Sequence, residues 1–414
     1  MAELKYWIWM NETGIRPYTC HQLLDYFGGP KEVFFAERED LRKVPDLSVR
    51  DLNTLCNKEL DHVYRIGDDM AAAKGRIITI QDAEYPERLR NIADPPLILY
   101  IRGTLPVIDD EAAIGIVGTR KCSTYGISAA QKIAEDIAMH GGLVVTGMAD
   151  GIDAAAARGA LKGGGHVVGV LGTGIERVYP AHKESVQLFE DVLEQGGCLL
   201  SEYPPGSEPL PFHFPRRNRI ITGLSVALVA LEIPSDKSGT MLSVNLALEQ
   251  SRDVFLVPAN IDSPTSRMSN QLITEGLSAI TEGWQALIDL ESRYPKIKRI
   301  SEAMPALRNE ALLENPLALP LKKSVKKAPL EKKVIDTKEK EVYIELDTLL
   351  KGRSDTEVII LKALDNTPIH VDEIIGRTNL PAQKVSVCLT TLQIAGSITA
   401  FPGKLYAYTA NVKK

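Results

Sequence analysis

The segment IGIVGTRKCSTYG, residues 114–126, constrains the fold of this chain more than any other. Residues 114–117 are a short apolar run rich in β-branched side chains, which is typical of a buried strand, and Gly118 ends that run. Ser123, or the threonine after it, can cap an amphipathic helix over 127–140 that two glycines then stop. Such a strand–turn–helix unit points backbone N–H groups and a helix N-terminus at an anion.

The residues in and around this turn narrow the kind of ligand. Arg120 and Lys121 add positive charge at the turn, so we predict a phosphate site there. The G-x-G-x-x-G pattern of nicotinamide enzymes is missing, and a second G-x-G at Gly172 and Gly174 is followed by Tyr179 and a proline where a helix should begin. The chain has neither a P-loop nor a G-x-S-x-G elbow, and no His or carboxylate set suggests a metal. We therefore expect no cofactor and no metal.

The central part of the chain alternates between predicted strands and helices. Strands are predicted at 143–146, 166–171, 198–201, 226–232, 253–257 and near 279, and helices at 153–161, 182–194, 218–223, 241–250, 270–274 and 284–290. This alternation predicts an α/β fold with a Rossmann-like, doubly wound, mainly parallel sheet. Ligands of such sheets bind outside the carboxyl ends of the strands. Glycine-bearing turns fall at that edge, at 118–126, 146–153, 171–180 and 201–206.

A basic segment, FHFPRRNRIITGLS at 212–225, is the second most informative stretch. It holds four polar residues at the start of a short predicted helix: Arg216, Arg217, Asn218 and Arg219. Arginines oppose the helix dipole at an N-terminus, a conflict that a bound anion or a carboxylate relieves. A solvated basic helix start is the alternative. The neighbouring aromatic residues either stack on bases or belong to the core; they are Phe212, His213 and Phe214.

The flanking regions differ in composition from the centre. Residues 1–75 predict a small helical domain of the sterile-alpha-motif or helix-hairpin-helix type, either contacting nucleic-acid backbone or acting as a docking bundle. Residues 292–353 form a Lys-rich linker, and 354–414 predict a winged helix that binds either a duplex or a protein partner. Lys384 is the only strong base on its third helix, which favours a protein partner. The net charge of −6 argues against a globally basic nucleic-acid binder but leaves room for a local basic groove. The five scattered cysteines suit a reduced, cytoplasmic protein.

The ordered motifs of residues 76–290 resemble those of the bacterial DNA-processing protein DprA, also called Smf. The motifs include GIVGTRKCSTYG, TGMADGIDAAAARGAL, VLGTGIERVYP, LLSEYPPG and FPRRNRIITGLS. The resemblance implies a non-enzymatic mediator of recombination that binds single-stranded DNA and protects it during natural transformation. It also implies that the protein loads the RecA recombinase. It further implies a homodimer through the later part of the Rossmann-like domain.

Candidate nucleic-acid-binding residues follow from matching this chain to the family motifs. The matching residues are Gly118, Arg120 and Ser123 in the first turn, Gly147, Gly151 and Asp153 in the second, the Arg216–Arg217–Asn218–Arg219 run, and Lys183 after the Tyr-Pro motif. The chain departs from the family pattern at three positions, namely Ala157, Ala259 and Met268.

Two other functions compete with this interpretation. The SGTM sequence at 238–241, before a predicted helix, suggests a nucleotide or nucleotide-sugar hydrolase, although the P-G-G-x-G-T motif of such enzymes is absent. Asp150 and Asp153 form a possible carboxylate pair, but we interpret Asp153 as a helix cap, and the sequence places no catalytic carboxylate for a hydrolase. An architectural protein that uses only its end domains is the third possibility.

Overall fold

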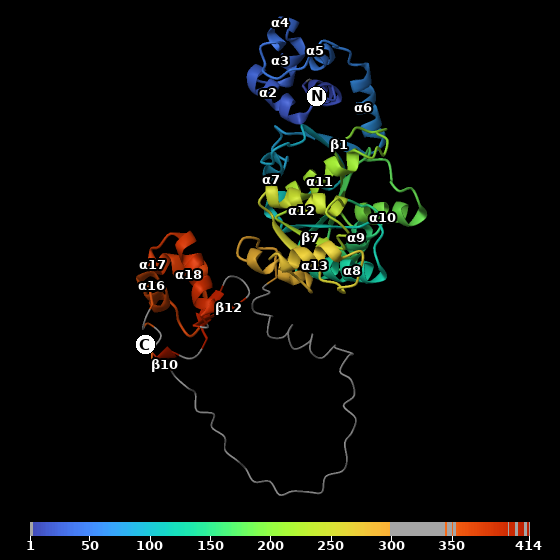
Figure 1. Cartoon of the computed structure of the whole chain (residues 1–414). Helices are drawn as coiled ribbons and strands as arrows, with labels where there is room; N and C mark the ends of the chain where they lie inside the picture. Colours follow the sequence, from blue (N-terminus) through green and yellow to red (C-terminus); the bar gives the residue numbers. More distant parts are fainter. Residues whose placement is uncertain are drawn as a thin grey trace, which may run out of the picture. The chain divides into compact units, whose positions relative to one another are not determined.

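The computed structural model describes residues 3–298, 344–345, 350, 353–395, 397–401, 405–409 and 412–413. The chain divides into two compact units, Met1–Arg308 and Asn309–Lys414, which are described separately (Figure 1). Most of the predicted linker lies outside the described residues. Its first residues do not behave as a linker, because Tyr294 and Ile297 are buried in the core of the first unit.

A nine-stranded sheet forms the centre of the first unit, in the order β1-β2-β6-β5-β4-β3-β7-β8-β9. The strands are β1 Gly75–Thr79, β2 Ile98–Gly103, β3 Ala113–Gly118, β4 Leu143–Thr146, β5 Val167–Leu171, β6 Cys198–Ser201, β7 Ala227–Leu231, β8 Asp253–Leu256 and β9 Ser278–Ala279. Strand β2 pairs antiparallel with both β1 and β6, and the other neighbours run parallel. The mainly parallel, doubly wound sheet predicted from the sequence is thereby confirmed.

Helices cover both faces of this sheet (Figure 1). One face packs against α8 Thr124–Met139, α9 Ile152–Lys162 and α10 Lys183–Glu194; the other packs against α7 Glu87–Arg90, α11 His213–Leu224, α12 Gly239–Glu249 and α13 Arg267–Thr274. Both faces are covered because each strand carries apolar side chains on both sides. In β3, Ile114 and Ile116 pack on the face covered by α8, α9 and α10, and Ala113 and Val117 pack on the opposite face. Short 3₁₀ turns stand at Ile108–Asp110, Gly283–Ala286 and Ile288–Leu290, the last two in place of the helix predicted at 284–290.

The amino-terminal helices are part of the same unit. They are α1 Leu4–Glu12, α2 Pro17–Phe27, α3 Pro30–Phe35, α4 Arg38–Leu41, α5 Val49–Leu55 and α6 Asp61–Ala72. Gly28 ends α2 with a left-handed φ of 89°, and Pro30 begins α3, where a missing N–H costs nothing. The hydrophobic core of the bundle continues into the sheet through Ile98 and Tyr100 of β2 and through Leu97, which precedes that strand.

The second unit contains the predicted winged helix. Its helices are α16 Asp355–Ala363, α17 Val371–Thr378 and α18 Ala382–Ile394, and its sheet joins β11 Ile369–His370, β13 Leu405–Tyr408 and β12 Ile398–Phe401 in that order. A further pair joins β10 Ile344–Glu345 to β14 Val412–Lys413. Ser354 caps α16 in a capping box with Glu357. On α18, Lys384 and Val387 are exposed.

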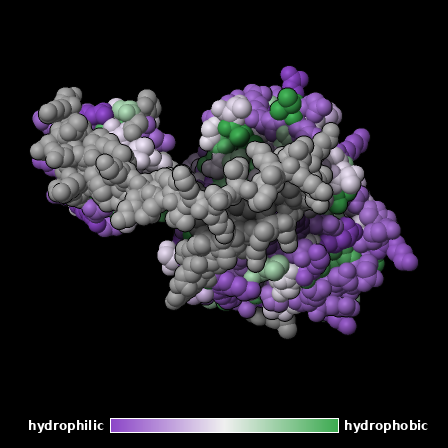
Figure 2. Space-filling model, turned by 90° about the horizontal axis from the view of Figure 1, so that it is seen from below, coloured by the Kyte–Doolittle hydropathy of each residue, from purple (hydrophilic) through white to green (hydrophobic). Residues whose placement is uncertain are grey.

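The described surface is mainly hydrophilic on the face that Figure 2 shows, with hydrophobic residues in small separate groups. Within the described residues, no helix combines the length and the apolar character that crossing a membrane requires.

Candidate nucleic-acid interface

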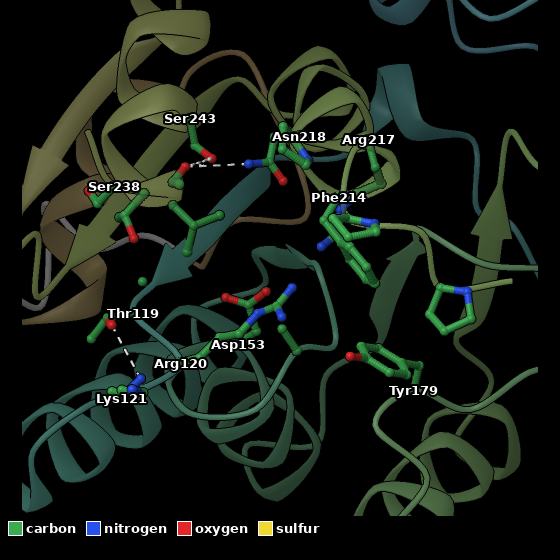
Figure 3. A pocket seen from close by; sticks show the side chains of 18 residues that line it. Thr119, Arg120, Lys121, Asp153, Tyr179, Phe214, Arg217, Asn218, Ser238 and Ser243 are labelled. Carbon is green, nitrogen blue, oxygen red and sulfur yellow. Dashed lines mark hydrogen bonds between the residues drawn. The ribbon is translucent and has the colours of Figure 1, made fainter. Parts of the chain in front are cut away.

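A cavity of about 500 Å³ opens at the carboxyl ends of β3 and β7. Strand β3 lies between β4 and β7, so the chain winds away from it in both directions. Open α/β sheets bind ligands at this topological switch point, because the connections on the two sides leave a gap between them. We call this cavity the crevice. Figure 3 shows the polar residues that line it, among them Thr119, Arg120, Lys121, Asp153, Arg217, Asn218, Ser238 and Ser243.

The first turn supplies the exposed positive charge of the crevice. Arg120 and Lys121 are both exposed and line it, and the N–H of Lys121 donates to Thr119 Oγ1 at 3.2 Å. The guanidinium of Arg120 lies 4.8 Å from the centre of the Phe214 ring, a cation–π distance that holds the arginine over the cavity.

Ser123 supports the turn from below. Its side chain caps α8 by accepting from the Gly126 N–H at 3.0 Å, which confirms the predicted cap. Its hydroxyl and N–H both donate to the Glu232 carboxylate, at 2.5 and 2.8 Å. The Ser123 hydroxyl is therefore bonded within the fold and does not line the crevice.

The second turn brings backbone close to two buried charges. A Cβ at Gly147 would lie 2.5 Å from the Arg217 guanidinium and 2.5 Å from Asp153 Oδ2, so only glycine fits between them. Gly151 has a left-handed φ of 82° and caps α9 without a side chain. The interpretation of Asp153 as the cap was wrong: Asp153 is the second residue of α9 and is buried in the floor of the crevice.

Burial shifts the protonation equilibria of both charges in the floor. Burial raises the pKa of Asp153 to about 6, although nearby Arg217 and the backbone groups of Ala149 and Gly118 favour the carboxylate. Burial also lowers the pKa of Arg217 to about 10, against the attraction of Asp153. Arg217 donates to the carbonyls of Gly147, at 2.7 Å, and Val170. These contacts fix its guanidinium in the crevice floor.

The raised pKa of Asp153 makes stability depend on pH. The pKa is about 6 in the folded protein against 3.8 in an unfolded chain, so the folded state binds more protons between these values. The free energy of unfolding should therefore fall by about 1 kcal/mol per pH unit as pH rises from about 4 to 6. Urea unfolding of the wild type and of Asp153→Asn at each pH checks this. The wild type should lose stability relative to Asp153→Asn over that interval, because the asparagine does not titrate, and a constant difference would contradict the prediction.

The structure separates the four residues of the Arg-Arg-Asn-Arg run. Helix α11 begins at His213, five residues before the predicted start, because Pro215 lies in the first turn, where its missing N–H is no loss. Successive helix residues point about 100° apart, so the run cannot face one direction. Arg217 and Asn218 line the crevice, and the Asn218 amide donates to the Gly239 carbonyl at 3.4 Å. Arg216 and Arg219, three residues apart, point elsewhere.

Arg219 is buried in an internal ion-pair network. Its Nη2 donates to Glu202 Oε1 at 2.6 Å and its Nε to Asp94 Oδ2 at 3.2 Å. Burial lowers its pKa, but the two carboxylates outweigh burial and raise the pKa above the usual value. Arg216 is half exposed and reaches the same Glu202 oxygen at 3.5 Å. Asp94 also accepts from the N–H of Tyr18, which connects the network to α2.

The remaining predicted residues take different positions. Phe214 lines the crevice beside Tyr179, with ring centres 5.4 Å apart, whereas His213 is buried and Phe212 is exposed. Lys183 begins α10 and is exposed, outside the lining of the crevice.

Sequence reasoning missed one wall of the crevice. Ser238, Thr240 and Ser243 line it around the first turn of α12, where Ser238 accepts from the Met241 N–H at 3.2 Å. The SGTM sequence was the available signal, and we had interpreted it as a possible enzyme motif. Among the described residues, no group of His, Cys, Asp or Glu side chains could hold a metal ion.

Comparison with known proteins decides the family. A family model described as DNA recombination-mediator protein A matches residues 76–291, just over half of the chain, and one described as the DprA winged helix domain matches 346–404. This chain belongs to the DprA family. The family is one of DNA-processing mediators of recombination, and the match spans both the crevice and the winged helix.

Individual members of the DprA family agree with this assignment. Protein Smf of Synechocystis sp. is 30% identical over 413 residues, covering 98% of each chain. DNA processing protein DprA of Bacillus subtilis is 37% identical over 209 residues, covering 50% of this chain and 68% of the relative. The X-ray structure of DprA from Streptococcus pneumoniae superposes with a TM-score of 0.59 at 29% identity, covering 68% of this chain and 96% of that one.

Proposed function

We propose that the crevice binds single-stranded DNA through its phosphates, without reading the bases. The observation that carries this proposal is the position of Arg120 and Lys121: two exposed cations at the switch point of the sheet, beside the first turn of α12. Membership of a family of DNA recombination mediators supports DNA as the polyanion. The proposed contacts are charge-assisted hydrogen bonds from side chains and backbone N–H groups, which position a strand but carry no sequence information.

Each of the two walls of the crevice carries groups that can bind a phosphate, so a strand could place successive phosphates against them. Arg120 and Lys121 stand on the β3 wall, and the first turn of α12 presents helix N–H groups on the other. Arg217 contributes a fixed positive charge from the floor, partly offset by Asp153. Arg219 has its charge satisfied by Glu202 and Asp94, so in this proposal it holds α11 in place instead of contacting DNA.

Charge substitution tests the proposal. Arg120→Ala and Lys121→Ala should each flatten the log–log salt dependence of affinity for a fluorescein-labelled dT₂₀ strand by about 0.7, since each removes one phosphate contact. The measurement is fluorescence anisotropy between 50 and 300 mM salt. Arg158→Ala is the matched control, because Arg158 is exposed on α9 outside the crevice lining. Unchanged affinity and slope in both crevice variants would overturn the proposal.

The wider role follows from the family. We infer that the chain delivers bound single strands to the RecA recombinase and acts as a homodimer, with the later part of the sheet domain as its dimer surface. Light scattering of the intact chain measures its oligomeric state. Assembly of RecA on protein-coated single strands, with wild type and with Arg120→Ala, tests delivery. If light scattering shows a monomer, the proposed homodimer is wrong. If RecA assembles equally well on strands coated with the wild type and with Arg120→Ala, the crevice has no part in delivery to RecA.

One observation favours a second candidate, a nucleotide hydrolase. Asp153 is the one carboxylate among the residues that line the crevice, and its pKa of about 6 would suit proton transfer near neutral pH. Its deep burial beside Arg217 argues for an electrostatic role in the floor. Chromatography of nucleoside monophosphates after incubation with the protein separates the two functions. Release of free base, lost in Asp153→Asn, would establish the enzyme.

A further inference from the structure

A buried glutamate at the end of β7 contacts the first turn, although the proposed contacts with DNA do not involve it. Glu232 directly follows β7, the strand that pairs with β3, and is 3% exposed. Its carboxylate accepts from the N–H and the hydroxyl of Ser123, at 2.8 and 2.5 Å, and from the hydroxyl of Thr265 at 2.8 Å. All three donors are neutral groups, so these contacts are hydrogen bonds and not ion pairs.

The start of α8 is shaped to receive this carboxylate. A Cβ at Gly126, in the first turn of α8, would lie 2.5 Å from Glu232 Oε2 and 2.6 Å from its Cδ, so a glycine is required there. The positive end of a helix dipole stabilises a negative charge at this point. Glu232 therefore takes the place beside the α8 N-terminus that the sequence offered to a phosphate, and DNA phosphates are left with the exposed cations and the α12 wall.

The backbone holds Glu232 in an unusual conformation. Its φ is 50°, in the left-handed region that residues with a side chain rarely adopt. The next residue is fixed through both of its backbone groups: the Ile233 N–H donates to Ser269 Oγ at 2.9 Å, and the Met268 N–H donates to the Ile233 carbonyl at 3.1 Å. Strained backbone of this kind persists where the surrounding structure requires it, and here it accompanies a side chain bonded to Ser123.

We infer that Glu232 is a positioning residue that orients Arg120 and Lys121, an inference that rests on the proposed function. The first turn leaves the sheet at Gly118, the last residue of β3, and its far end is Ser123, the N-cap of α8. Glu232 fixes that far end through two hydrogen bonds. With both ends fixed, the residues between them have few conformations available, so the two cations meet a strand with little loss of freedom on binding. Glu232 thus acts on DNA only through the turn.

Three substitutions, measured by anisotropy on the intact chain, separate the reach of this side chain from its charge. Glu232→Ala removes both and should weaken dT₂₀ binding at least about tenfold. It should also flatten the log–log salt slope by about 1.4, or about 0.7 for each of two lost phosphate contacts. Glu232→Asp keeps the charge but is one methylene short of Ser123, so it should behave like Glu232→Ala. Glu232→Gln should restore most of the affinity, since its oxygen can accept from the Ser123 N–H and its amide can donate to the two hydroxyls.

A double-mutant cycle shows whether Glu232 acts through the two cations. In a protein that carries both Arg120→Ala and Lys121→Ala, Glu232→Ala should have no further effect on affinity, because the groups that it positions are gone. Glu111→Ala is the matched control, since Glu111 is also buried, at 7% exposed, but lies just before β3 at the opposite end of that strand. This control should leave the affinity and the salt slope unchanged. Thermal unfolding of each variant confirms that the comparison is made on folded protein.

The outcomes separate this inference from the proposed function. If Glu232→Ala weakens binding by the same factor with and without the two cations, or leaves the affinity unchanged, the positioning role is overturned and phosphate binding by the cations stands. Wild-type affinity in Glu232→Asp together with a loss in Glu232→Gln would also overturn it, because charge and not reach would be required. If Arg120→Ala and Lys121→Ala bind dT₂₀ like the wild type, the proposed function fails first. Should Glu232→Ala fail to fold, Glu232→Asp takes its place in the cycle.

Discussion

Arg219→Ala should destabilise the fold by about 3–5 kcal/mol while leaving the DNA affinity of the folded protein within twofold of wild type. The substitution would leave the Glu202 carboxylate, which is 4% exposed, without its closest partner at 2.6 Å. An uncompensated buried charge costs several kcal/mol, far more than a surface ion pair contributes. Urea unfolding measures the stability, and anisotropy at low temperature measures the affinity.

Arg216→Ala is the matched comparison, because both arginines approach the same Glu202 oxygen. Arg216 does so at 3.5 Å from a half-exposed position, so its loss should cost less than about 1 kcal/mol. A double variant, Arg219→Met with Glu202→Leu, should recover much of the lost stability, because it removes both buried charges together. Lost affinity with unchanged stability in Arg219→Ala would instead place that arginine on the DNA.

Gly151→Ala should destabilise the fold by about 2–6 kcal/mol and also abolish most DNA binding. An alanine at φ 82° and ψ −124°, a backbone conformation that L side chains rarely adopt, is strained by roughly 1–3 kcal/mol. Its Cβ would also lie 2.6 Å from the Thr119 carbonyl oxygen and 2.8 Å from that of Arg120. These are backbone atoms that cannot rotate away, so the turn carrying Arg120 and Lys121 must move. Overpacking of this kind adds about 1–3 kcal/mol.

Gly164→Ala provides the control for backbone strain alone. Gly164 also has a positive φ, 75°, but a Cβ there would meet nothing within 4 Å. This variant should lose only the strain energy and should bind dT₂₀ normally. Thermal unfolding and anisotropy on the two variants therefore separate strain from displacement of the first turn. Equal losses in both would show that the 119–121 turn is not built on Gly151.

The sequence pattern was sufficient to predict the strands of the sheet, but it did not predict which way individual side chains point. Strands β4 and β6 have the predicted bounds, because each is a short, mainly apolar run that directly follows two glycines. Helix α11 began earlier than predicted because proline is tolerated in a first turn, which local pattern reading treats as a break. Helical rotation then sent Arg216 and Arg219 to one side and Asn218 to another.

Long-range partners explain why part of the site could not be predicted. Arg219 pairs with Asp94, 125 positions earlier, and Ser123 with Glu232, 109 positions later. No local signal marks either carboxylate as a partner. The first turn was predictable because its glycine, cap and cations are contiguous in sequence. The α12 wall required the sheet order, which places the segment after β7 beside the segment after β3.

The hydrophobic core that the amino-terminal helices share with β2 has a consequence for how this protein can be divided. Tyr100 and Ile98 are fully buried there, in contact with residues contributed by the bundle. Cutting the chain at residue 76, where the family match begins, would strip that side of the sheet and cut into β1. The amino-terminal helices therefore complete the hydrophobic core on that side of the sheet, and a fragment without them would expose Ile98 and Tyr100 to solvent.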